Sequence, residues 1–338
     1  MRISKSLVGA AAVTAAVLAT AACGGGTVSE SPNPGSGGGT ATGGGSGQQY
    51  VAMVSKGFQH QFWQAVKQGA EDKAKELNVK VTFDGPASET MVDQQLQMVQ
   101  EAIDKKPNAL AYAALDPQAC VPLMNAAKTA KIPVVQFDAG CDGSDYPLNI
   151  SKTDSKKAGA LAADHMASLI GDSGEVAVIG HSQINSTGVE RRDGFLDEMK
   201  AKHSNIKVVD VQYGDGDHLK SADIAKAMIA AHPGLKGLYG TNEGSAIGIV
   251  DAAQELNLSA GKITIVGFDS GKAQIDAIKS GLMAGAITQD PIGIGKSTVQ
   301  SAVDAIAGKQ LQKVIDTGSY WYDKTNIDDP KIAAVLYQ

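Results

Sequence analysis

The chain has 338 residues and a formal net charge of −6, with 36 acidic side chains against 30 basic ones. The charges are spread along the sequence, and no basic patch is interleaved with aromatic residues, so we expect no nucleic-acid partner. The part that follows the first 49 residues is long for one hydrophobic core and comfortable for two lobes.

Residues 1–22 have the layout of a secretory signal peptide. The segment starts with Arg2 and Lys5, continues with an apolar stretch rich in Ala, Val and Leu, and ends at small residues. That apolar core is too short to span a bilayer comfortably, and no later apolar run approaches the ~18 residues that a membrane-spanning helix needs. We therefore expect export of the chain and removal of residues 1–22.

The next segment, residues 23–49, predicts a lipid anchor followed by a tether. Residues 20–23 (TAAC) resemble the lipobox of bacterial lipoproteins, in which the mature chain begins with a lipid-modified cysteine, here Cys23. Thr20 stands where that motif prefers Leu, which keeps cleavage by ordinary signal peptidase as an alternative. The residues after Cys23 are nearly all Gly, Ser, Thr and Pro, a composition typical of a flexible linker. We expect anchoring at the outer face of the cell membrane.

From Tyr50 onward, short apolar runs alternate with longer helical patterns. This alternation predicts βαβ units, in which parallel strands are covered by helices on both faces. The strand candidates are too many for one small sheet, so we expect an α/β protein with two lobes that divide near residues 150–154; a (β/α)8 barrel is the alternative. The predicted strands are YVAMVS, VKVTF, ALAYAA, IPVVQF, EVAVIG, IKVVDVQY, LKGLYG, KITIVGF and AGAITQ.

Three short motifs suggest chemistry that their contexts do not support. Residues 171–174 (GDSG) join a helix to a strand, which favours a turn over a protease nucleophile. Residues 295–297 (GKS) resemble the end of a phosphate-binding loop, but Asp290 stands at the position of that motif's first glycine and would repel phosphate. Residues 215–217 (DGD) offer too few oxygen ligands for calcium, so Asp217 is predicted to cap a helix. We expect neither a metal nor a cofactor.

A different set of side chains follows the predicted strands. Ligands of parallel sheets bind at the carboxyl ends of the strands. Aromatic faces with several hydrogen-bonding groups suit a polyhydroxylated ligand, although singly the aromatics could pack a helix and the carboxylates could cap one. The set comprises Phe58, Phe62, Trp63, Asp138, Arg191, Arg192, Asn242, Glu243, Asp269 and Gln289.

Seven separated motifs, found in the same order, make residues 50–338 similar to the type I periplasmic sugar-binding proteins of ABC transporters, in the ribose-binding-protein-like branch. The resemblance implies two Rossmann-like lobes joined by a three-crossing hinge near Thr153, Asp290 and Asp316, with a monosaccharide between them. The implied lobes are residues 50–152 plus 290–316, and residues 153–289 plus 317–338. The motifs are VAMVSKGFQHQFWQAVKQGA, IPVVQFDAG, TDSKKAG, ERRDGF, GTNEGSAIG, IVGFDSG and ITQDPIG.

The resemblance also implies roles for individual residues. Phe62 and Trp63 match the stacking aromatics, and Ser55 matches a strand-end serine of the first lobe. Lys56, Phe58 and His60 lie in a loop that is one residue longer here and could add contacts. The implied polar contacts are Asp138, Arg191, Asn242, Asp269 and Gln289.

Three positions depart from the ribose pattern, because Ala113, Ala139 and Gly216 stand in place of Asn, Arg and Phe. The pocket thereby loses two hydrogen-bonding groups and one ring wall, which puts ribose in doubt. A site that hydrogen-bonds specific hydroxyls can discriminate by ~10⁴, so such changes are large enough to switch the sugar. We expect a pentose or a hexose.

Cys120 and Cys141 remain after processing of the precursor, with a spacing that matches no metal motif. Cys120 opens the helix after one predicted strand, and Cys141 follows the next strand. The two loops are neighbours at one edge of a parallel sheet, and export permits disulfides, so we expect these cysteines to be bonded.

The leading hypothesis is a monomeric, lipid-tethered receptor that closes over a monosaccharide and presents it to an ABC permease. A secreted glycosidase using Asp138 and Asp269 is the alternative. A sugar-sensing regulator of the lac-repressor type shares the fold, but a signal peptide and tether stand where its DNA-binding domain would be.

Overall fold

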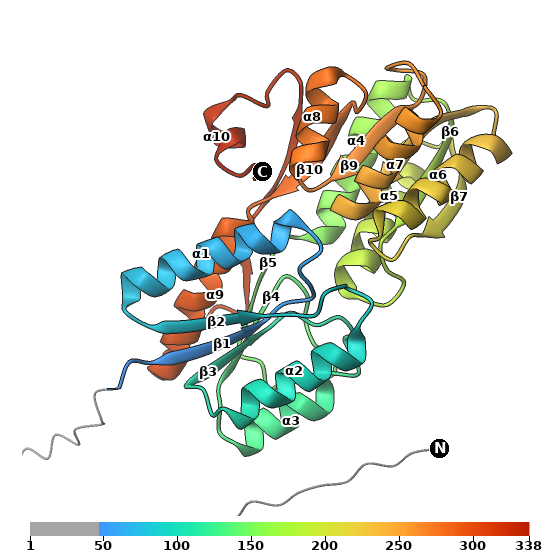
Figure 1. Ribbon diagram of the computed structural model, residues 1–338. Coiled ribbons are helices and arrows are strands. Elements are labelled where there is room, and N and C mark those ends of the chain that lie inside the picture. Colours follow the sequence, from blue (N-terminus) through green and yellow to red (C-terminus); the bar gives the residue numbers. More distant parts are fainter. Residues whose placement is uncertain (1–46, 338) are drawn as a thin grey trace, which may run out of the picture. The chain divides into compact units, whose positions relative to one another are not determined.

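The computed structural model describes residues 47–337, and every structural statement below concerns these residues. The predicted signal peptide, Cys23 and nearly all of the predicted tether lie outside this range. The described chain forms two six-stranded sheets that are each covered by helices on both faces (Figure 1). The predicted two-lobed α/β fold is confirmed, and the barrel alternative is wrong because the strands form two open sheets.

The first sheet is built from strands at both ends of the described chain. All of its neighbouring strand pairs are parallel. We call this sheet and the helices packed on it the first lobe. Its strand order is β11 (Val314–Asp316), β5 (Ile150–Lys152), β4 (Val134–Phe137), β3 (Ala109–Tyr112), β1 (Tyr50–Val54) and β2 (Lys80–Asp84).

The second sheet has the same plan with one difference at its edge. Its pairs are parallel except the last, in which β12 runs antiparallel to β10. We call this sheet and its helices the second lobe. Its strand order is β12 (Ser319–Asp323), β10 (Gly285–Gln289), β9 (Thr264–Phe268), β8 (Leu235–Gly240), β6 (Gly174–Gly180) and β7 (Ile206–Tyr213).

Helices cover both faces of each sheet because alternate strand residues point to opposite sides. In β1, Val51 and Met53 share an apolar cluster with α1 and α9, whereas Ala52 and Val54 share one with α2 and α3. Figure 1 shows these two helix pairs on opposite sides of the first sheet. The first lobe contains α1 (Gln61–Leu77), α2 (Val92–Asp104), α3 (Val121–Thr129) and α9 (Pro291–Ile306); the second contains α4 (Ser155–Ile170), α5 (Ser186–Lys202), α6 (His218–Ala231), α7 (Glu243–Glu255), α8 (Lys272–Ser280) and α10 (Pro330–Ala333).

The chain passes between the two sheets three times: after β5, after β10 and between β11 and β12. Two of these crossings are hydrogen-bonded to each other. The Thr153 hydroxyl donates to the Gly318 carbonyl at 3.1 Å, and the Thr317 amide donates to the Lys152 carbonyl at 3.0 Å. The crossing strands are thus held side by side.

The three misleading motifs have structural roles. Gly171 ends α4 in the left-handed conformation, with φ 73°, as the turn interpretation predicted. Asp217 caps α6 by accepting the Lys220 amide at 2.7 Å, as predicted. Gly295 allows α9 to approach α1, since a Cβ there would lie 2.1 Å from the Val66 carbonyl oxygen. Asp290 caps α9 through the Gly293 amide.

Cys120 and Cys141 form a disulfide in the structure, with their Cα atoms 5.9 Å apart. Cys120 lies immediately before α3, and Cys141 lies in the segment after β4. Within residues 47–337, no helix is long and apolar enough to cross a membrane.

Candidate sugar-binding site

One small cavity lies between the two lobes at the carboxyl ends of their strands. Its volume is about 10 Å³, room for roughly one water molecule, because side chains of both lobes nearly fill it. Nine of the eleven predicted contact residues line it, together with two residues that the sequence did not indicate. The lining is Lys56, His60, Phe62, Trp63, Glu89, Asp138, His181, Arg191, Asn242, Asp269 and Gln289.

Phe62 and Trp63 form the aromatic part of the lining. Both belong to the first turn of α1 and are buried, and their ring centroids lie 4.9 Å apart in an edge-to-face arrangement. Trp63 also packs edge-on against Phe137 at 6.2 Å. Its indole nitrogen donates to Glu89 at 2.8 Å, which fixes the ring plane. This side of the cavity therefore has a rigid apolar surface.

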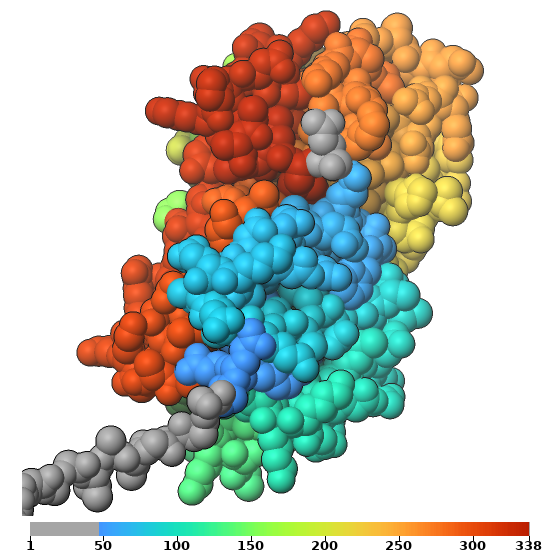
Figure 2. Space-filling model, turned by 60° about the vertical axis from the view of Figure 1, so that its left-hand side comes forward, coloured from blue at the N-terminus to red at the C-terminus, as the bar shows by residue number. Residues whose placement is uncertain are grey.

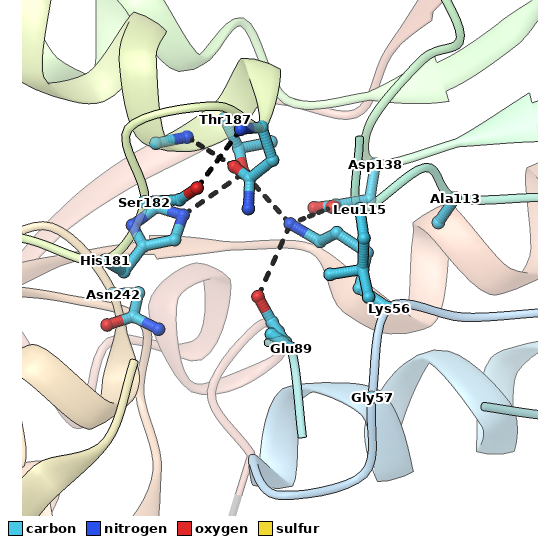
Figure 3. Close-up of polar contacts among 12 residues, drawn as sticks. Lys56, Gly57, Glu89, Ala113, Leu115, Asp138, His181, Ser182, Thr187 and Asn242 are labelled. Atoms are coloured by element: carbon cyan, nitrogen blue, oxygen red, sulfur yellow. Dashed lines mark hydrogen bonds and ion pairs between the residues drawn. The ribbon is translucent and has the colours of Figure 1, made fainter. Parts of the chain in front are cut away.

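Lys56 brings a buried positive charge into the cavity from the loop after β1. Its ammonium lies 2.9 Å from an Asp138 oxygen and 3.8 Å from Glu89, and it donates to the Thr187 hydroxyl at 3.0 Å (Figure 3). Thr187 belongs to α5, so this contact joins the lobes. Burial by itself would raise the pKa of Glu89, but the charge of Lys56 and the Trp63 hydrogen bond help to hold it below its usual value.

The second lobe contributes a network centred on Asp269. One of its oxygens accepts the Gln289 side-chain amide at 2.7 Å, and the other lies 3.9 Å from the Arg191 guanidinium. Arg191 also lies over the Phe268 ring, 3.7 Å from its centroid. Burial raises the pKa of Asp269, while Arg191 and Gln289 oppose that rise.

Two polar atoms of this network have no hydrogen-bond partner among the described residues. They are the Nε of Arg191, a donor, and the Oε1 of Gln289, an acceptor, and both are buried. Buried polar groups are nearly always hydrogen-bonded. A ligand hydroxyl can both donate and accept, so it suits one atom of each kind.

His60 and Asn242 meet across the interface between the lobes. The Asn242 amide nitrogen lies 3.3 Å from the His60 Nε2. Burial is the main reason that the pKa of His60 falls below its usual value, which favours the neutral ring as an acceptor. Gly216 lies beside this pair, since a Cβ there would be 3.1 Å from Asn242 and 3.2 Å from His60. A side chain at position 216 would therefore crowd both residues.

Two predicted contact residues do not line the cavity. The Ser55 hydroxyl is turned toward backbone carbonyls, at 3.2 Å from both Gly57 and Asp84. Phe58 packs edge-to-face against Phe83, with centroids 5.9 Å apart. These residues shape the loop after β1 instead of facing the space between the lobes.

Glu89 and His181 were missed from the sequence. His181 directly follows β6, so its strand-end position was a usable signal. Its ring lies 2.8 Å from the Thr241 hydroxyl and 3.3 Å from that of Thr187, and burial holds its pKa well below the usual value. Glu89 lies in the loop between β2 and α2, away from any strand end, and only the fold brings it to Trp63.

The two carboxylates proposed for a glycosidase have different partners. Asp138 is held by Lys56, and Asp269 is held by Gln289 and Arg191. Among residues 47–337, no group of three or more His, Cys, Asp or Glu side chains is arranged to hold a metal ion. The arrangement can hold a small polar ligand by stacking and hydrogen bonding.

Residues 51–310 match the family model described as "Periplasmic binding protein domain". The chain is 30% identical over 262 residues to the D-allose-binding periplasmic protein of Escherichia coli, covering 75% of this chain and 83% of the relative. It is 27% identical over 254 residues to the ribose import binding protein RbsB of Bacillus subtilis, covering 75% and 80%.

A solved structure supports the same assignment. The ABC transporter solute-binding protein of Agrobacterium vitis, bound with α-D-tagatopyranose, superposes with a TM-score of 0.82 at 31% identity, covering 86% of this chain and 100% of that chain. These relatives are substrate-binding proteins and not enzymes, so the glycosidase alternative is not supported. The chain belongs to the type I periplasmic sugar-binding proteins of ABC transporters, in the ribose-binding-protein-like branch.

Proposed function

We propose that this protein is the extracytoplasmic receptor of an ABC sugar importer, which closes over one monosaccharide by hinge motion and delivers it to a membrane permease. The observation that carries this proposal is the set of aromatic and polar side chains from both lobes that line the small cavity. Both lobes line it, so a ligand that contacts both stabilises the closed form selectively. A ligand that contacted only one lobe would not shift the equilibrium between the open and closed forms.

The lining of the cavity suits a single pyranose or furanose ring, whose entry would move the side chains that nearly fill the space. In the proposed complex, the ring lies on Phe62 and Trp63, while its hydroxyls reach the polar groups of both lobes. The unpaired donor of Arg191 and the unpaired acceptor of Gln289 take one hydroxyl or two neighbouring ones. The proposed contacts are Lys56, His60, Phe62, Trp63, Asp138, Arg191, Asn242, Asp269 and Gln289.

The sugar is proposed to be a pentose or a hexose, bound through contacts that differ from those of the ribose pattern. Ala113 and Ala139 leave out two polar groups of that pattern, while Lys56 and Glu89 add a buried charge of each sign. The relatives described above are named for D-allose and ribose or bind tagatose as a pyranose, so the aldohexoses and ketohexoses are the first to test.

Isothermal titration calorimetry against pentoses, hexoses and polyols tests the proposal. We expect one sugar, or a few close stereoisomers, to bind with a Kd of about 1 μM or tighter, which corresponds to roughly −8 kcal/mol. The same sugars should raise the melting temperature. Absence of binding across the whole panel would overturn the proposed function.

The hinge is proposed to lie at the three crossings near Thr153, Asp290 and Asp316, with the lobes formed by residues 50–152 plus 290–316 and residues 153–289 plus 317–338. The two hydrogen-bonded crossings would limit the motion to bending. The protein is proposed to act as a monomer, because each chain carries both walls of its own cavity.

The anchor is proposed to be a lipid on Cys23, with residues 24–49 as the leash that leaves both lobes free to move near the permease. Such tethering raises the local concentration of receptor at its partner. We expect Cys23→Ala to move the protein from the membrane fraction to the soluble fraction while leaving sugar affinity unchanged. Fractionation of cells expressing both forms measures this, and equal membrane retention of the variant would refute the anchor.

A further inference from the structure

We propose that Glu243 and Gln61 form a latch between the lobes, which strengthens sugar binding without touching the sugar. The proposal rests on the proposed closure over a monosaccharide. Glu243 lies outside the small cavity and lines a larger one, which shares His60 with it and has a volume of about 310 Å³. Its effect on affinity would therefore come from the contact between the lobes and from the position of the residues that it holds.

The latch begins at the N-terminus of α1, which lacks a cap from its own lobe. The N-cap residue His60 makes no side-chain cap hydrogen bond, and the first turn contains no acidic residue. The first amides of a helix have no partner within the helix. Here the Gln61 amide donates to Glu243 Oε1 at 2.9 Å, and the Phe62 amide donates to Glu243 Oε2 at 3.2 Å. A carboxylate from the second lobe thus caps a helix of the first lobe.

The second half of the latch runs in the opposite direction. α8 of the second lobe begins at Lys272, and its N-cap Gly271 has no side chain to supply a cap. The Lys272 amide donates to the Gln61 side-chain oxygen at 2.7 Å. Each lobe therefore caps a helix of the other. Figure 2 shows the blue surface of the first lobe's N-terminal part meeting the orange surface of the second lobe.

The groups around Glu243 show how contact between the lobes stabilises its buried carboxylate. Asp269 accepts the Glu243 backbone amide at 3.1 Å, and the Tyr337 hydroxyl lies 3.4 Å from Oε2. Burial raises the pKa of Glu243 to about 7, with Asp269 adding to the rise, while the two α1 amides oppose it. The cost of burying this carboxylate is thus offset in part, mainly by donors of the other lobe, which separation of the lobes would remove.

The latch also holds the turn that carries the aromatic wall. Phe62 donates its amide to Glu243 while its ring lines the sugar cavity. Asp269 connects the other side, since it accepts the Glu243 amide and lines the same cavity. Glu243 is therefore a positioning residue between the two walls.

The test uses the whole protein with spin labels at Lys75→Cys on α1 and Lys279→Cys on α8, both exposed positions of different lobes. Double electron–electron resonance measures the distance between the lobes, without sugar and with saturating D-allose or D-ribose. We expect Glu243→Ala to shift the population toward longer distances and to weaken sugar binding about five- to tenfold, through faster dissociation, as expected for loss of a helix cap. Glu243→Gln keeps one strong acceptor, so its distance distribution and its sugar affinity should lie between those of the parent protein and those of Glu243→Ala.

Asp116→Ala is the matched control, because Asp116 also accepts two backbone amides, those of Gln118 and Ala119 at 2.8 and 2.9 Å, but within one lobe. It should leave the distance distribution unchanged. Unchanged distances in folded Glu243→Ala would overturn the latch, and so would an equal shift in Asp116→Ala. If the parent protein bound no sugar at all, the proposed function would fail, whereas the distances would still decide whether the latch exists.

Discussion

The two lobes have equivalent aspartates at the cavity, and these aspartates have different partners. Asp138 follows β4 and Asp269 follows β9, which occupy the same place in the two strand orders. Both aspartates adopt the left-handed region, with φ values of 58° and 78°, a conformation that Asp takes more readily than most non-glycine residues. Asp138 pairs with Lys56, whereas Asp269 pairs with Gln289 and Arg191.

This difference separates what the fold provides from what the side chains provide. The repeated topology brings a carboxylate to the same edge of each sheet. The neighbouring side chains then make the first lobe the wall with the two aromatic rings and the lysine, and the second lobe the wall with the arginine and the amide side chains. Chemistry in such a fold belongs to the site and not to the architecture.

The largest effect is expected from Asp269→Asn. The variant keeps the shape of the side chain but leaves the buried Arg191 without its carboxylate, and truncating one partner of a buried charge pair is strongly unfavourable. We expect sugar affinity to fall about 100-fold in calorimetry, with the circular dichroism spectrum unchanged. Asp223→Asn, at an exposed ion pair with Lys226, should bind normally. Affinity within twofold of the parent in Asp269→Asn would refute the role of this network.

A smaller effect is expected from the equivalent change, Asp138→Asn. Lys56 keeps a second carboxylate, Glu89, at 3.8 Å, so its charge is not left alone. We expect affinity to fall about tenfold in the same titration. An effect as large as that of Asp269→Asn would mean that the two aspartates contribute equally to sugar affinity, which would contradict the difference between the lobes.

The aromatic wall is tested by Phe62→Leu, which keeps an apolar side chain but removes the ring face. Aromatic stacking beyond area burial is worth about 0.5–1.5 kcal/mol, so we expect a loss of affinity of roughly two- to tenfold. Phe83→Leu is the comparison, because Phe83 belongs to the same first-lobe core but does not line the cavity. That variant should lower the melting temperature and leave the Kd unchanged, and the reverse pattern would contradict stacking on Phe62.

Much of the fold was predictable because strand and helix leave periodic apolar patterns. The runs that became β1, β6 and β9 are apolar on both faces, as strands buried between helices must be. The three-residue strands β5 and β11 were not predicted, because they are too short for an apolar pattern, and β11 pairs with β5 alone.

The site was predictable where its residues follow strands, as Asp138, Asp269 and Gln289 do. Glu89 was not, because its loop position carries no signal and only tertiary packing brings it to Lys56 and Trp63. Glu243 was noticed at a strand end, but its contact with Gln61 joins residues 182 positions apart. No local pattern encodes a contact of that kind.

A crystal structure of the protein with the tightest-binding sugar of the calorimetric panel tests the central claim most directly. We predict one sugar ring between the lobes, lying on Phe62 and Trp63, with hydroxyls within 3.2 Å of Asp269 and of the atoms Arg191 Nε and Gln289 Oε1. A sugar bound elsewhere, or bound in this cavity through contacts with one lobe alone, would contradict the account.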